Sequence, residues 1–93
     1  MNSYVREPAV SGIFYPKSRN ELNVNLESLF RDSNFGPGKL PPSNIKERIY
    51  GMVSPHAGYM YSGAVAANGY YQLSSSKFES AIILGPNHYG LGS

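Results

Sequence analysis

The chain of 93 residues is predicted to belong to the α/β class, with parallel strands. Three consecutive segments predict this class: a short apolar run at residues 49–53, a helical pattern at residues 62–73, and a second apolar run, "SAIILGP", at residues 80–86. Strand, helix and strand in this order form a βαβ unit, whose parallel strands are joined by a right-handed crossover. The second run is continuously apolar, as expected of a parallel strand that is covered on both faces.

A helix is predicted before this unit. Residues 6–18, "REPAVSGIFYPKS", are expected to be extended, because Pro8, Gly12 and Pro16 interrupt any regular pattern. Ser18 is a good N-cap, and Glu21 three residues later completes a capping box. Apolar residues then recur at helical spacing, so we expect a helix over residues 19–31: Leu22, Leu26, Leu29 and Phe30.

The helix expected at residues 62–73 has an unusual number of small side chains. Ser62 is predicted to cap it, and the small residues that follow would let it lie close to a sheet: Gly63, Ala64, Ala66 and Ala67. Gly69 in its interior costs about 1 kcal/mol relative to alanine, which indicates tight packing or a bend at that position.

Composition excludes several classes of protein. Eight basic and six acidic residues are scattered without a Lys/Arg cluster, so nucleic acid is not an expected partner. The absence of cysteine excludes disulfides and thiolate ligands within these residues. Charged residues stand where a signal peptide needs an apolar core, and no run approaches the length of a bilayer span, so we expect no membrane association and a cytoplasmic location.

The two histidines of the chain occupy two similar turns. His56 lies in "SPHAGYMYSG", residues 54–63, and His88 lies in "GPNHYG", residues 85–90. Each turn follows one of the predicted parallel strands, so both histidines are expected at the same carboxyl edge of the sheet. In open α/β sheets ligands bind at this edge, and the spacing therefore predicts a shared site.

The chemistry of such a site has more than one interpretation. Two imidazoles with room for a third ligand are typical of a divalent transition metal, including non-heme iron. Without a metal the pair could act as acid and base, or each ring could only bond a backbone group in its turn. Tyr59, Tyr61 and Tyr89 could donate hydrogen bonds to a substrate, and Asn87 could orient one, although packing and turn formation are the simpler roles.

The number of predicted elements is small for a parallel sheet. Two helices and two or three strands do not cover both of its faces. We therefore expect these residues to be the amino-terminal part of a larger α/β domain.

Three segments resemble the Memo family, named for a mediator of cell motility: "VREPAVSGIFYP", "GMVSPHAGYMYSGAVAANGYYQL" and "AIILGPNH". Archaeal and bacterial relatives are known as AmmeMemoRadiSam system protein B. The resemblance implies an α/β fold related to the LigB-like class III extradiol dioxygenases, with residues 1–93 forming the amino-terminal part of one domain. It also implies that His56 and His88 ligate iron or copper. The third ligand of the family is a cysteine farther toward the carboxyl end, and this chain has none.

Three functions follow as hypotheses. The first is a metal-dependent oxidoreductase of dioxygenase-like type, in which the two histidines hold the metal. The second is a non-catalytic module that binds a peptide or small molecule in the same crevice, as in signalling. The third is an accessory factor of a modification system. The sequence predicts neither the substrate nor the oligomeric state.

Overall fold

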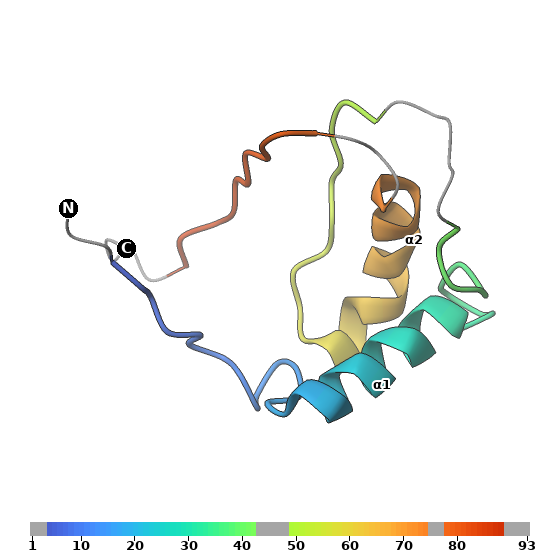
Figure 1. The fold of residues 1–93 in the computed structure, drawn as a ribbon, viewed down its shortest axis with the longest axis horizontal. Helices are drawn as coiled ribbons and strands as arrows, with labels where there is room; N and C mark the ends of the chain where they lie inside the picture. Colours follow the sequence, from blue (N-terminus) through green and yellow to red (C-terminus); the bar gives the residue numbers. More distant parts are fainter. Residues whose placement is uncertain (1–3, 43–48, 75–77, 89–93) are drawn as a thin grey trace.

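The computed structural model describes residues 4–42, 49–74 and 78–88 (Figure 1). Helix α1 (Arg19–Arg31) is followed by a π-helical turn, η1 (Tyr59–Gly63), and by helix α2 (Ala64–Leu73). Figure 1 shows α2 set at a steep angle against α1, with segments 49–58 and 78–88 running in broadly the same direction on one side of α2. No strand is assigned within the described ranges, so the α/β class and the βαβ unit stay predictions.

Helix α1 has the predicted bounds. The backbone N–H of Glu21 donates to Ser18 Oγ over 3.1 Å, which confirms Ser18 as the N-cap. The apolar face is half-buried, while Val24 on the other side is exposed. The inward-facing set is the one that the helical spacing predicts: Leu22, Leu26, Leu29 and Phe30.

The prediction that a helix begins with Ser62 as its cap is wrong. Helical structure starts earlier, at Tyr59, and its first five residues form the wider turn η1 before α2 begins at Ala64. The carbonyl of Gly58 accepts hydrogen bonds from the backbone N–H groups of Tyr61 and Ser62, which starts this turn. Ser62 lies inside η1, and α2 has no side-chain cap.

The two helices approach closely where α2 begins. A Cβ atom on Gly63 would lie 2.7 Å from Leu29 Cδ1, so any larger residue there would require the Leu29 side chain to move. Gly36, in the loop after α1, is equally confined: a Cβ there would lie 2.6 Å from the carbonyl oxygen of Leu29. The side-chain amide of Asn68 then ties α2 to this loop by donating to the carbonyl of Phe35 over 2.7 Å. These contacts make one unit of α1, the loop and α2.

Segment 49–53 packs on α2 with one face only. A Cβ atom on Gly69 would overlap the thioether of Met52, which confirms the tight packing predicted from Gly69. The adjacent Val53 is 100% exposed. Segment 81–84 is exposed on both faces, with Ile82 and Ile83 each 90% exposed. A strand needs a neighbouring strand for its hydrogen bonds. No strand is assigned among the described residues that could pair with either segment.

The confined position of Gly36 gives a test of the helix packing. Gly36→Ala forces Cβ against backbone oxygens of Leu29 and Asp32, so we expect the free energy of unfolding to fall by about 1–3 kcal/mol. Gly51→Ala is the matched control, because a Cβ at Gly51 meets nothing within 4 Å. Urea unfolding followed by circular dichroism measures both. Equal stabilities of the two variants would contradict the close approach at Gly36.

Asp32 gives a test of the loop after α1 through pH. Its carboxylate accepts hydrogen bonds from the backbone N–H groups of Phe35, at 2.8 Å, and Asn34, at 2.9 Å. These bonds favour the charged form and hold the pKa of Asp32 below its usual 3.8. The stabilisation is therefore complete above pH 3.8 and is lost as the pH falls below that value, through the folded-state pKa. We expect Asp32→Asn to reduce the loss of stability between about pH 5 and about pH 2 in urea titrations. An unchanged pH profile in Asp32→Asn would show that these bonds do not contribute.

Candidate functional site

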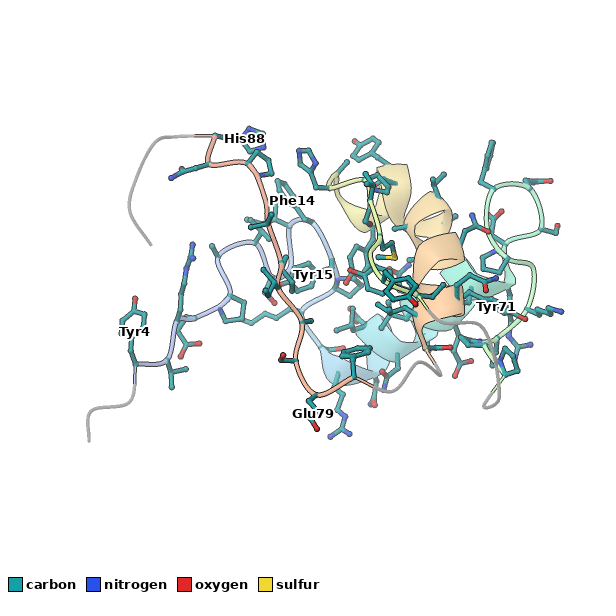
Figure 2. All side chains as sticks on the ribbon, turned by 90° about the horizontal axis from the view of Figure 1, so that it is seen from above. Tyr4, Phe14, Tyr15, Tyr71, Glu79 and His88 are labelled. Atoms are coloured by element: carbon teal, nitrogen blue, oxygen red, sulfur yellow. The ribbon has the colours of Figure 1, made fainter. Side chains whose placement is uncertain are left out.

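The structure brings His56 and His88 together. Their ring centroids lie 5.4 Å apart, and the ring planes are inclined by 32°. His56 comes from the turn before η1, and His88 comes from the end of segment 78–88. Figure 2 shows His88 and Glu79 at opposite ends of that segment. Both histidines are exposed, so the pair is open to solvent and to a ligand.

The turn that carries His56 is fastened on two sides. The backbone N–H of Tyr59 donates to the carbonyl of Phe14 over 2.8 Å, which joins the start of η1 to the amino-terminal segment. On the other side, Ser62 Oγ accepts from the N–H of Ala57 at 3.2 Å and donates to the carbonyl of Ala57 at 3.1 Å. The backbone of Ala57, which follows His56, is therefore held by the side chain of Ser62 in η1.

The amino-terminal segment reaches this turn because it folds back on itself. The carbonyl of Val10 accepts from the N–H groups of Ile13 and Phe14, and the N–H of Gly12 donates to the carbonyl of Tyr15 over 2.7 Å. Gly12 adopts a φ of 83°, a value that glycine reaches without strain. The turn presents Phe14 and Tyr15 toward the site.

A hollow of about 530 Å³ adjoins His56, while His88 does not line it. His56 and Pro55 stand at it, and Ser62 also lines it. The remaining wall is almost entirely apolar or aromatic and comes from the amino-terminal segment, α1 and α2: Val10, Phe14, Leu26, Leu29, Ala66 and Tyr70. An apolar hollow with a few polar groups at one side is the usual form of a small-molecule site.

The other predicted site residues do not all lie at the hollow. Tyr59 lines the hollow and its ring lies 5.5 Å from that of Tyr15, with the planes inclined by 34°. Tyr61 is 83% exposed and does not line the hollow. Asn87 is exposed beside His88, and Tyr89 lies outside the described residues. Of the predicted tyrosines, the structure places only Tyr59 at the hollow among the described residues.

Sequence reasoning missed several residues of the site. Phe14 and Tyr15 are far from the histidine turns in sequence, and no local pattern indicates that they meet Tyr59. The bonds from Ser62 to Ala57 span five residues, a separation that helical periodicity does not predict. "YMYSG" carries no distinct pattern for such a turn.

The donors present fit two positions of a metal site. With a metal–nitrogen distance of about 2.0–2.1 Å, two imidazoles bound to one ion at a near-tetrahedral angle have centroids about 5 Å apart. The observed separation of 5.4 Å matches this value. Within residues 4–42, 49–74 and 78–88, however, no group of three or more His, Cys, Asp or Glu side chains could hold a metal ion. A further ligand would have to come from outside these ranges.

The described residues thus form a two-helix unit that carries a histidine pair beside an apolar hollow. The family model described as "Memo-like protein" matches residues 6–93, and the chain belongs to this family. The match includes both histidine turns. None of the helices in the described ranges is long and apolar enough to cross a bilayer.

Relatives in archaea and bacteria support the same assignment. The chain is 49% identical over 88 residues to a "MEMO1 family protein" of Nitrosopumilus maritimus, covering 95% of this chain and 31% of the relative. It is 51% identical over 92 residues to a "MEMO1 family protein" of Thermotoga maritima, covering 94% of this chain and 32% of the relative. The chain therefore spans about a third of the length of these relatives. No solved structure matches it significantly.

Proposed function

We propose that His56 and His88 are two ligands of an iron or copper centre, and that this centre belongs to a metal-dependent oxidoreductase of dioxygenase-like type. The observation that carries the proposal is the 5.4 Å separation of the two rings. They come from turns 32 residues apart, 88 − 56, and meet beside a hollow that could take an organic substrate. A bound iron or copper would provide open coordination positions for substrate or oxygen.

The residues of this chain have distinct roles in the proposed site. His56 and His88 donate nitrogen lone pairs, which requires both rings to be neutral. The apolar walls at Phe14 and Leu29 exclude water from one side of the bound substrate. The hydroxyl of Tyr59, at the same hollow, is a hydrogen-bond donor for a polar group of that substrate.

Metal titration tests the histidine pair. We expect copper(II) to bind at least about tenfold more weakly to His56→Ala and to His88→Ala than to the wild type. Removing a residue that only hydrogen-bonds to a metal ligand already lowers metal affinity by about 10–100-fold. Gln72→Ala, at an exposed position of α2, is the control and keeps wild-type affinity. Equilibrium dialysis near pH 7 measures the affinities. Unchanged copper binding in both histidine variants would overturn the proposal.

The hollow favours a second candidate function. Its wall is mainly apolar and includes Phe14, Leu29 and Tyr70, so it is also suited to hold an apolar ligand without any metal. In this case the chain is part of a binding module for a small molecule or a peptide side chain, in signalling or as an accessory factor. The two functions differ in whether binding depends on His88.

A small apolar probe separates the two functions. In the module, toluene binds in the hollow and shifts the NMR signals of the Ala66 and Ala67 methyl groups. Ala66→Leu fills part of the hollow and is expected to weaken toluene binding several-fold. Val65→Leu is the matched control, since Val65 is an exposed neighbour that does not line the hollow. Binding that is retained in His88→Ala supports the module, whereas binding that is unaffected by Ala66→Leu places toluene elsewhere and contradicts it.

A further inference from the structure

The side chain of Ser62 makes two hydrogen bonds that are not part of the backbone bonding of a helix. Its Oγ accepts from the backbone N–H of Ala57 and donates to the carbonyl of the same residue. We propose that Ser62 is the positioning residue of His56, and that its hydroxyl holds the imidazole within reach of His88. This inference rests on the proposed metal function for its biological meaning, while its geometry stands on these bonds and on the ring separation.

The two bonds act on the backbone immediately after His56. The N–H of Ala57 belongs to the peptide group that joins His56 to Ala57. Because peptide groups are planar, fixing that N–H fixes the torsion ψ of His56. The carbonyl of Ala57 belongs to the next peptide group, so the second bond fixes the turn beyond it. The direction of the His56 side chain relative to η1 therefore depends on the hydroxyl of Ser62. On the other side of His56, Ser54 Oγ donates to the carbonyl of Pro55 over 3.2 Å and acts on the preceding peptide group.

A hydroxyl is the side chain group that this arrangement needs. It combines one donor with two acceptor lone pairs, so a single oxygen satisfies both groups of Ala57. From its place inside η1, this oxygen reaches a residue five positions earlier, before η1 begins. Single π-helical turns of this kind are frequent at functional sites.

The opposite side of the turn is held by the amino-terminal segment, through one backbone hydrogen bond and the contact between the rings of Tyr15 and Tyr59. The N–H of Tyr59 donates to the carbonyl of Phe14, and a Cβ on Gly58 would lie 3.4 Å from that oxygen, in ordinary contact. The amino-terminal segment thus fixes the position of the turn but does not orient the peptide group that follows His56. Among the described residues, Ser62 provides the side-chain bonds to that peptide group, so we expect removal of its hydroxyl to act on ring placement more than on the fold.

The test compares variants of equal shape. Threonine and valine have nearly the same shape. Ser62→Thr keeps the hydroxyl, whereas Ser62→Val has a methyl group in its place. Ser28→Ala is a further control, because Ser28 Oγ also donates to a backbone carbonyl, that of Asn25 in α1. Two quantities are measured on the full chain: NMR cross-peaks between the rings of His56 and His88 without metal, and copper(II) affinity. Circular dichroism monitors the helices.

We expect the cross-peaks between the two rings to lose intensity in Ser62→Val and Ser62→Ala. We also expect these variants to bind copper about tenfold more weakly, at the low end of the range for residues that support a metal ligand. Ser62→Thr and Ser28→Ala keep both properties. Wild-type cross-peaks in Ser62→Val, or their loss in Ser62→Thr with intact helices, would overturn the proposal.

The two readouts also separate this inference from the metal function. If copper binds neither the wild type nor the variants through the histidines, the metal function fails. The cross-peaks without metal still decide whether Ser62 positions His56. If copper depends on both histidines but is unaffected by Ser62→Val, the metal function stands and the positioning role is refuted.

Discussion

The close approach of α2 to α1 at Gly63 is the contact on which the rest of the structure depends. The absent side chain of Gly63 lets Leu29 pack directly against the start of α2. This contact places η1, which precedes Gly63, beside the amino-terminal segment, where the N–H of Tyr59 reaches the carbonyl of Phe14. The hollow next to His56 is bounded by the same pieces, so its walls and the histidine turn are fixed together.

Local sequence rules predicted α1 but not the start of α2. The bounds of α1 follow from Ser18, Glu21 and the apolar spacing, all within one stretch of chain. The start of α2 is preceded by the wider turn η1, whose first residue, Tyr59, is bonded to the distant Phe14. Segments 49–53 and 80–86 were predicted as strands from their apolar character. They carry the sequence of strands, but ladder hydrogen bonds depend on neighbours that a local pattern does not reveal.

The candidate site could be predicted in part for a similar reason. The position of each histidine after an apolar run, combined with the expected βαβ topology, predicted that His56 and His88 would lie together. Their rings are 5.4 Å apart, while the topology itself stays a prediction. The expectation concerned only chain direction and element order, so it did not need the details of packing. The apolar hollow and the contact between Tyr15 and Tyr59 arise from packing between distant segments. Single-sequence patterns carry no information on such contacts.

The segments that carry the two histidines differ in their exposure, which bears on the proposed site. The turn of His56 is tied by Ser62 and, through Tyr59, by Phe14. His88 ends a segment that is exposed along residues 78–88, with apolar side chains such as Ile82 and Ile83 open to solvent. An exposed apolar segment gains stability when further polypeptide covers it, and this chain spans only about a third of its relatives. Covering that segment would also fix His88. In the proposed metal site, affinity would therefore depend on His88 being ordered, since a ligand that must first be ordered binds more weakly by the free energy of ordering it.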